Sequence, residues 1–342
     1  MEHFAEYKKQ TEPEKYQKAE NWGVAIGLQQ VDGLTPSKYL ISVAKDNIEG
    51  KISIGEVSKQ ISNYYKKNPA KTQKEIGEKE ADEVSARIAD LLSTHTFSFS
   101  PAEYISIHKF LFSGIFDSKI AGKIRTYDIV KDEPILNGDT VIYGRANSIK
   151  ETLDYDFKQE KEFKYQGLSK KEKIEHIARF ISGIWQIHPF AEGNTRATAV
   201  FAIKYLYTLG FETNNDLFEK YSQYFRNALV RANYQNLSED IPYTMEYLNK
   251  FFGNLLLGQK NLLDNREMQI KAVKTTQKTT QKTAQKILQI LKENPTLTRT
   301  ELAKMLGLTP DGIKWNLDKL KKANQIRRIG GDKGGSWEVL SK

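Results

Sequence analysis

Apolar side chains recur at the three- and four-residue spacing of an amphipathic helix through most of residues 12–262. This spacing lets each segment bury one face against its neighbours, and it constrains the fold more than any other feature of the chain. The pattern is clearest over Val84–Leu92, Tyr104–Phe112, Ile174–Ile187 and Val200–Leu209. We therefore expect a mainly α fold, with an all-helical core in this part of the chain.

One short stretch within the helical region carries a β signal. Residues 135–143 place β-branched and aromatic side chains around Asn137 and Gly138, and an Asn-Gly pair between such residues is typical of a two-residue hairpin turn. A lone hairpin is not stable by itself in water. We expect a short β-hairpin here that packs on another part of the protein, and an element of this kind often covers a site.

Charge is distributed unevenly along the chain, whose net charge is +9. Residues 271–342 hold thirteen Lys and three Arg against six acidic residues, a net +10, which leaves −1 for residues 1–270. A small basic segment beside a near-neutral large one indicates nucleic-acid contact by the small one. A Lys-rich surface that serves only solubility is the alternative, and charge alone does not separate the two.

The composition excludes several classes of protein. No run of about 18 apolar residues is present, so we expect no transmembrane helix and no membrane partner. The first residues are charged and lack the apolar stretch of a signal peptide. Cysteine is absent, which excludes disulfides and thiolate metal sites. We expect a cytoplasmic protein.

The C-terminal residues begin with a linker and then a helical pattern. Residues 274–283 repeat Thr, Gln and Lys without large apolar side chains, as linkers do. Further along, Thr298 and Glu301 have the spacing of a capping box, which predicts a helix over Arg299–Leu306 that ends at Gly307.

A second helix and two strands are expected after it. The helix over Asp311–Lys322 places apolar residues on one face, namely Ile313, Leu317 and Leu320, and the strands cover 325–329 and 336–340 around a Gly-rich turn. Helices and strands in this order are the parts of a small winged helix-turn-helix domain. If this domain binds DNA, the expected contacts are the basic residues of its second helix and wing, Lys314, Lys319, Arg327 and Arg328.

A nine-residue string, His188 to Arg196, lies between two apolar helical segments and carries the chemistry. The start of the second helix offers free backbone N–H groups to an anion. Gly193 lets the backbone approach it closely, and Asn194 can tolerate an unusual backbone angle. Arg196 adds a fork of donors for phosphate oxygens. Glu192 supplies an oxygen suited to Mg²⁺, and His188 can accept a proton near neutral pH. This set suits attack on a nucleotide phosphate.

The string resembles the Fic motif, His-x-Phe-x-(Asp/Glu)-Gly-Asn-Gly-Arg-x-x-Arg. Six specified positions match, at His188, Phe190, Glu192, Gly193, Asn194 and Arg196, and Pro189 is also usual in that family. The resemblance implies an all-helical Fic core with a short β-hairpin flap. It implies a protein adenylyltransferase (AMPylator) that transfers AMP from ATP to a Ser, Thr or Tyr hydroxyl of a target protein and also modifies itself.

The resemblance also assigns roles to residues. His188 takes the hydroxyl proton, Glu192 holds Mg²⁺, and phosphates are bound by the loop residues Gly193, Asn194, Thr195 and Arg196. Asn233 is similar to the family's adenine-contacting Asn. The hairpin corresponds to the flap that aligns the target by β-augmentation, with Leu136, Asn137, Gly138 and Tyr143 as its contact residues. Members of the family often form homodimers.

Two positions depart from the Fic motif. Thr195 stands where the motif has Gly, and Ala199 replaces the final Arg, which in the family holds the γ-phosphate and pairs with an autoinhibitory Glu. Upstream, Glu49 with its following Gly is similar to the family's inhibitory motif and is the candidate inhibitory residue, although Lys45 stands where that motif has Ser or Thr. The alternative is that Glu49 lies merely at the end of a helix.

These features divide the chain into four regions. They are an N-terminal helical region with the candidate inhibitory helix over 1–75, a Fic catalytic domain over 76–262, a linker over 263–285 and a winged helix-turn-helix domain over 286–342. Two other functions remain open. One is a different reaction on the same fold, such as another nucleotidyl or phosphoryl transfer or removal of AMP (deAMPylation). The other is a DNA-binding regulator whose Fic core is vestigial.

Overall fold

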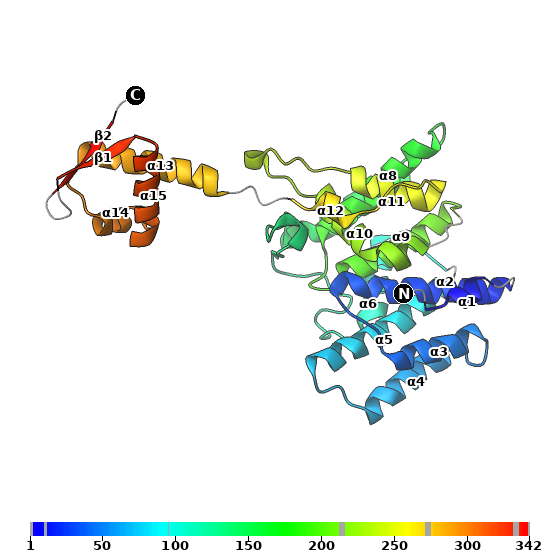
Figure 1. Ribbon diagram of the computed structural model, residues 1–342. Helices are drawn as coiled ribbons and strands as arrows, with labels where there is room; N and C mark the ends of the chain where they lie inside the picture. Colours follow the sequence, from blue (N-terminus) through cyan, green and yellow to red (C-terminus); the bar gives the residue numbers. More distant parts are fainter. Residues whose placement is uncertain are drawn as a thin grey trace. The chain divides into compact units, whose positions relative to one another are not determined.

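The computed structural model describes residues 3–9, 12–94, 96–211, 216–270, 275–330 and 335–340 (Figure 1). The chain divides into two compact units, Met1–Ile270 and Lys271–Lys342. Helices dominate the first unit, and the two β-strands assigned among these residues lie in the second. The prediction of a mainly α fold is therefore confirmed. None of the described helices is long and apolar enough to cross a membrane.

The first unit is built from helices and short 3-10 turns joined by loops. In chain order these are α1 (Ala5–Lys8), α2 (Pro13–Gly27), η1 (Leu28–Asp32), α3 (Lys38–Ile48), α4 (Ile54–Lys67), α5 (Gln73–Ser93), α6 (Pro101–Phe112), η2 (Pro134–Leu136), η3 (Ala146–Ser148), α7 (Ile149–Glu162), α8 (Lys170–Ile187), α9 (Asn194–Thr208), α10 (Asp216–Ala232), η4 (Leu237–Glu239), α11 (Glu246–Leu257) and α12 (Asn265–Met268). The four helical segments predicted most clearly lie in α5, α6, α8 and α9, except that Leu209 is one residue past the end of α9.

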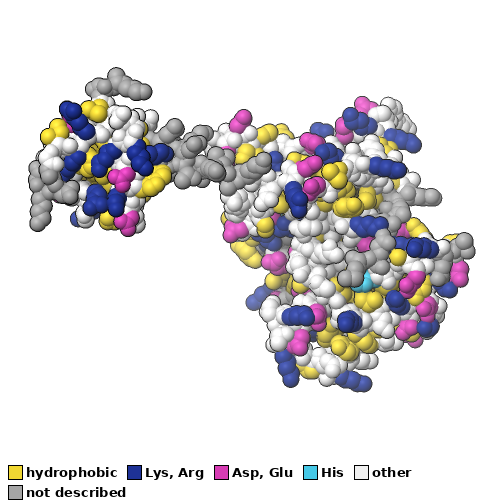
Figure 2. Space-filling view, in the orientation of Figure 1, with side chains coloured by type: hydrophobic (Ala, Val, Ile, Leu, Met, Phe, Trp, Pro, Cys, Tyr) yellow, Lys and Arg dark blue, Asp and Glu magenta, His cyan; other side chains and the backbone are white. Residues whose placement is uncertain are grey.

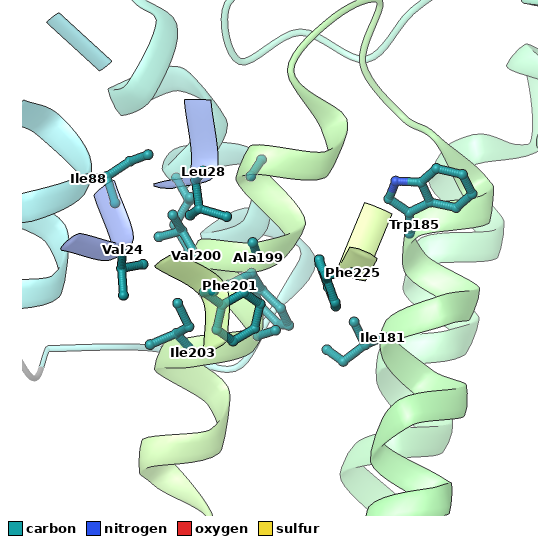
Figure 3. Close-up of a cluster of buried hydrophobic side chains, with 14 of the residues drawn as sticks. Val24, Leu28, Ile88, Ile181, Trp185, Ala199, Val200, Phe201, Ile203 and Phe225 are labelled. Atoms are coloured by element: carbon teal, nitrogen blue, oxygen red, sulfur yellow. The ribbon is translucent and has the colours of Figure 1, made fainter. Parts of the chain in front are cut away.

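Helix α9 lies at the centre of the first unit and is buried along nearly its whole length, from Asn194 to Leu206. It packs against α5, α6, α8 and η1. Figure 3 shows apolar side chains of α9 lying between those of α8 and those of α2 and η1. A helix buried on all sides cannot shift easily, so its N-terminus, where the His188 loop enters, has a fixed position.

Helix α8 delivers the loop at a fixed point because both of its ends are defined. Ser169 and Glu172 form a capping box at its start. Its last helical residue is Ile187, and the next residue, His188, adopts a left-handed conformation with φ 50°. Since a left-handed residue stops a helix, the chain turns at the histidine itself.

The expected β-hairpin at 135–143 is wrong in its detail, because no strand forms there. The chain does double back: Glu133 N donates to Asp139 O at 2.9 Å and Gly138 N to Glu133 O at 3.2 Å. Pro134 has no N–H to give a ladder, and the turn is the 3-10 element η2 followed by left-handed Asn137 and Gly138. We call residues 131–143 the flap.

The second unit has the predicted order of elements. These are α13 (Thr275–Glu293), α14 (Arg299–Leu306), α15 (Pro310–Lys322), β1 (Ile326–Ile329) and β2 (Ser336–Val339), and the two strands pair antiparallel. The capping box of Thr298 and Glu301 is present. A separate core is formed by residues of all five elements, among them Ile287, Leu302, Ile313, Leu317, Leu320, Ile326 and Trp337.

The segment expected as a linker, 263–285, is divided between the two units. Met268 of α12 is buried in the core of the first unit, and Ile270 N donates to Ile135 O at 2.8 Å. Helix α13 already begins at Thr275. Part of the segment expected as a linker is therefore helical.

Candidate functional site

The string His188 to Arg196 forms a tight loop whose second bend requires glycine. Gly193 caps the N-terminus of α9 with φ 75°, a conformation that side chains with a Cβ rarely adopt. A Cβ at this position would lie 2.5 Å from Cε2 of Phe112. The loop backbone therefore passes directly over the Phe112 ring, which glycine alone allows.

Asn194 and His108 hold the loop in shape. Asn194 closes it by accepting from Phe190 N at 3.0 Å and donating to Phe190 O at 2.8 Å. The Phe190 ring stacks on the His108 ring, with centroids 3.7 Å apart. His108 accepts from Gly122 N at 2.9 Å, so its other nitrogen, Nε2, carries the proton donated to Glu192 O at 2.9 Å. Burial lowers the pKa of His108 to about 4.

Sequence reasoning missed His108. The residue lies within the apolar helical pattern of α6, where a histidine ordinarily packs in the core, and its partners Gly122 and Glu192 are 14 and 84 residues away. A polar residue on the buried face of a predicted helix was the available signal, since such a group needs partners.

His188 is oriented to act as a base. Its Nδ1 donates to the Trp185 carbonyl oxygen at 3.2 Å, which leaves Nε2 unprotonated. Only 3% of the residue is exposed, and burial together with the nearby charge of Lys131 lowers its pKa well below the ordinary value. The imidazole is therefore neutral at pH 7 and can accept a proton.

Arg125, which the sequence did not single out, fixes the backbone around His188. Its Nε donates to His188 O at 2.8 Å and its Nη1 to Tyr127 O at 2.7 Å, while Nη2 reaches the carbonyls of Gly144 and Ile187. The side chain is fully buried. One guanidinium thus joins the end of α8 to both arms of the chain that lead into the flap.

The N-terminus of α9 presents a set of unused donors. None of the backbone N–H groups from Glu192 to Arg196 donates a hydrogen bond to any residue that the structure describes. A helix N-terminus also carries partial positive charge. Beside it lies a cavity of about 740 Å³, within the usual size of a small-ligand pocket, and its lining includes Asp32, Glu80, Glu192, Arg196 and Arg226.

Arg196 lines this cavity, but its guanidinium is bound by acidic residues. Nη2 donates to Glu80 Oε1 at 2.7 Å and Nη1 to Gln29 Oε1 at 3.0 Å. Nε lies 2.7 Å from Asp32 Oδ2, an ion pair without hydrogen-bond geometry. In this structure carboxylates occupy the fork that was expected to hold phosphate, and the phosphate role of Arg196 stays a prediction.

The other predicted loop residues differ in what they offer. The Glu192 side chain is 59% exposed and its Oε2 lies 3.5 Å from Lys131 Nζ, so its carboxylate is accessible to a cation. Thr195 uses its hydroxyl to accept from Trp185 Nε1 at 3.0 Å. The hydroxyl of Thr195, which stands where the motif has Gly, thus has a hydrogen-bond partner inside the protein.

Asn233 does not line the cavity. Its amide nitrogen donates to Ser182 Oγ at 2.8 Å and to Leu229 O at 2.9 Å, so these contacts tie α10 to α8. The adenine-contacting role of Asn233 stays a prediction, and in this structure its side-chain nitrogen is already engaged.

The inhibitory role of Glu49 stays a prediction, and in this structure the residue lies away from the cavity. Its carboxylate accepts from the Tyr7 hydroxyl at 2.7 Å and pairs with Lys51 at 2.5 Å, and it neither contacts Arg196 nor lines the cavity. Residues on either side explain this, because Ile48 is buried in the core and Asn47 accepts from Trp22 Nε1, which turns Glu49 toward α1. The acids at Arg196 come from η1 and α5 instead.

The predicted flap residues lie in two environments. Leu136 and Tyr143 are buried, and the Tyr143 ring lies on the His188 ring with centroids 4.2 Å apart. Asn137 and Gly138 form the exposed tip. Tyr143 therefore covers the base, while the tip faces outward.

The basic residues predicted for DNA contact lie mainly on the surface of the second unit, and Figure 2 shows lysine and arginine side chains gathered on its visible face. Lys314 and Lys319 are exposed, with Lys319 Nζ 5.2 Å from the centre of the Trp315 ring. Arg328 lies over the Trp337 ring, and Arg327 pairs with Glu338.

Helix α15 also has a polar residue on its buried side. Asn316 is only 8% exposed and donates to Gly312 O at 2.8 Å. A cleft of about 430 Å³ lies between α14, α15 and the strands, and its basic lining residues are Arg299, Lys314, Lys321 and Arg328. The structure thus adds Arg299 and Lys321 to the basic residues that can face a partner.

Comparison with known proteins finds a family match within each unit. Residues 98–206 match the model of the Fic/DOC family, and residues 280–327 match that of winged helix-turn-helix DNA-binding domains. A solved structure, the N-terminal FIC domain of Bep8 protein (VirB-translocated Bartonella effector protein) from Bartonella sp. 1-1C, is similar with 18% identity and a TM-score of 0.42 over 56% of this chain and 88% of that one. No curated protein matches. The chain carries a Fic domain followed by a winged helix-turn-helix domain.

Proposed function

We propose that the Fic domain of this chain transfers AMP from ATP to a hydroxyl group of a target protein. The observation that carries the proposal is that a neutral imidazole and a helix end with unused N–H donors belong to one short loop. His188 has Nε2 free, and six residues further the N-terminus of α9 offers backbone N–H groups beside a cavity. The match of residues 98–206 to the Fic/DOC family supports the same reaction class.

The proposed reaction uses both the imidazole and the helix end. His188 Nε2 takes the proton of a Ser, Thr or Tyr hydroxyl, and the oxygen attacks the α-phosphorus of ATP. The bond from that phosphorus to the bridging oxygen breaks, and pyrophosphate leaves. The N–H groups of α9 stabilise the negative charge that develops on the phosphoryl oxygens. Arg125 keeps the imidazole in place by binding its backbone carbonyl.

Mg²⁺ fits the chain as a partner of ATP rather than as a resident ion. Among the described residues no group of three or more potential ligand side chains could hold a metal. One accessible carboxylate, Glu192, is nevertheless enough, because Mg²⁺ is commonly bound by one or two carboxylates together with substrate phosphates and water. When bound, the ion would neutralise charge on the leaving pyrophosphate.

Incubation with ATP labelled at the α- or the γ-phosphate tests the reaction, with intact mass as the second readout. We expect retention of the α-label and a gain of one adenylyl group on the protein itself or on an added acceptor protein. His188→Ala should lower the rate by about 10²–10⁴-fold, as loss of a general base does. Retention of the γ-label instead would show phosphoryl transfer and contradict the proposal.

We propose a second function for the second unit, binding of duplex DNA. The match to winged helix-turn-helix DNA-binding domains supports it, as do the exposed Lys314 and Lys319 and the cleft lined by Arg299, Lys321 and Arg328. Helix α15 would enter the major groove, and the basic residues of the strands and of α14 would bind phosphates.

A further inference from the structure

We infer that Arg226, Glu133 and Tyr143 form a latch that holds the flap closed over His188, and that nucleotide phosphate in the cavity releases it by taking Arg226. The three are positioning residues for the reaction. The nucleotide step rests on the proposed function, whereas the closed latch itself rests only on contacts within the chain.

The latch is a continuous line of contacts from the cavity to the base. Arg226 of α10 lines the cavity, and its Nη1 lies 2.8 Å from Glu133 Oε2. Glu133 Oε1 accepts from the Tyr143 hydroxyl at 3.2 Å. The Tyr143 ring in turn covers the His188 ring at 4.2 Å. The first and last of these contacts join the flap to α10 and to the end of α8, and the middle one links two residues of the flap.

Glu133 also organises the flap through its backbone. Its carbonyl accepts from Leu136 N at 2.9 Å and from Gly138 N at 3.2 Å, and its N–H donates to Asp139 O at 2.9 Å. The same residue thus supplies the backbone groups that hold the turn and the carboxylate that pairs with Arg226. We therefore expect the flap to shift when the Glu133 carboxylate leaves its buried place.

Arg226 can exchange its partner Glu133 for another anion at little cost. The Glu133 side chain is 1% exposed, yet its Oε2 makes no hydrogen bond despite its 2.8 Å distance from Arg226. Charge attraction rather than a directed bond holds the pair. A phosphate in the cavity offers Arg226 more charge and bidentate geometry, so Arg226 can transfer to it without losing a hydrogen bond.

Loss of Arg226 leaves Glu133 as an unpaired buried charge, which is strongly unfavourable. The carboxylate gains most by moving into water, and the flap and Tyr143 move with it. His188 is then uncovered after the nucleotide has bound. The latch would make the enzyme bind ATP before it admits the target hydroxyl.

The closed latch is tested without nucleotide by Glu133→Gln, which keeps the shape and removes the charge. We expect carbethoxylation of His188 by diethyl pyrocarbonate, and hydrogen exchange of the flap amides, to be about tenfold faster than in the natural chain. Tyr143→Phe, which removes the hydroxyl and keeps the ring, should act in the same direction. His176, measured in the same samples, serves as the internal reference.

Glu219→Gln is the matched control, because it makes the same change in another buried ion pair, that with Lys8 at 2.6 Å. It should leave both rates at His188 and the flap unchanged. Equal rates in Glu133→Gln, Tyr143→Phe and the natural chain would overturn the latch.

The nucleotide step is tested with a non-hydrolysable ATP analogue and Mg²⁺. Bound analogue should accelerate exchange of the flap amides in the natural chain to the level of Glu133→Gln and add nothing further in that variant. Saturating binding with unchanged or slower flap exchange would overturn the release step. If the analogue does not bind at all, the proposed function fails, whereas the nucleotide-free comparison still decides the latch.

Discussion

Arg196 ends the loop that begins at His188, His108 holds that loop in shape, and both side chains are buried. Arg196 is a fixed charge held by two carboxylates of distant elements. His108 is a neutral imidazole whose two nitrogens are both used by backbone groups. The first affects what the cavity can bind, and the second affects how stability depends on pH.

Removal of a carboxylate from Arg196 should strengthen ATP binding. Asp32→Asn leaves Glu80 in place and frees part of the guanidinium for a phosphate oxygen. We expect the Kd for ATP, measured by calorimetry with Mg²⁺, to fall about tenfold, which corresponds to about 1.4 kcal/mol. Asp132→Asn is the matched control, since it removes a carboxylate from the same cavity lining without a contact to Arg196. Equal effects of the two variants would mean that only the net charge of the cavity matters.

Acid should destabilise the protein through His108. Its pKa is lowered to about 4 by burial, whereas the unfolded chain protonates it near 6.5. Between these two pH values the unfolded state binds one more proton than the folded state. The contribution of His108 to the free energy of unfolding is therefore complete above pH 6.5 and is lost as the pH falls toward 4. Urea unfolding should show a decrease of about 2 kcal/mol from pH 7 to pH 5 from this residue. His108→Phe should flatten that dependence, and an unchanged slope would refute the assignment.

At the scale of elements, local signals were predictable and long-range contacts were not. The Thr298–Glu301 capping box and the helix it opens were predicted and found, because a cap involves residues three positions apart. The hairpin was predicted from Asn137 and Gly138, but Pro134 removes the strand pairing. The partners of Arg196, Asp32 and Glu80, come from elements more than a hundred residues away, which no local pattern reveals.

The start of α9 should be intolerant of any side chain at Gly193. Gly193→Ala combines a left-handed backbone with a Cβ 2.5 Å from Phe112 Cε2, and we expect a loss of about 3 kcal/mol in unfolding free energy. Gly138→Ala is the matched control, with φ 88° but nothing within 4 Å of the added Cβ, and it should cost about 1 kcal/mol. Similar losses of unfolding free energy at both sites would mean that the Phe112 ring moves aside for the added Cβ.

At the scale of the whole molecule, catalysis and DNA contact are proposed for separate units. Each unit has a hydrophobic core of its own, and the excess positive charge lies in the smaller one. The Fic/DOC match falls within one unit and the winged helix-turn-helix match within the other. A substitution confined to one unit should therefore leave the activity proposed for the other intact.

DNA affinity of the full chain should fall steeply with salt, with a log–log slope of about −0.9 per phosphate contact. Fluorescence anisotropy with a labelled duplex measures it. Arg328→Glu should flatten the slope by about one contact, and Arg327→Glu should do less because Glu338 already pairs with Arg327. Lys171→Glu, an exposed site in the first unit, is the control. Absence of binding at low salt would refute the proposal.

Trp185 lies edge-on to His188, with ring centroids 5.2 Å apart and planes at 88°. At this distance the fluorescence of Trp185 is sensitive to the charge of the imidazole. A protonated imidazole beside an indole quenches its fluorescence, whereas a neutral one does so far less. Emission from Trp185 should therefore report the protonation of His188 in real time. Replacement of the other tryptophans by phenylalanine would leave Trp185 as the only source of this emission. Those residues are Trp22, Trp315 and Trp337.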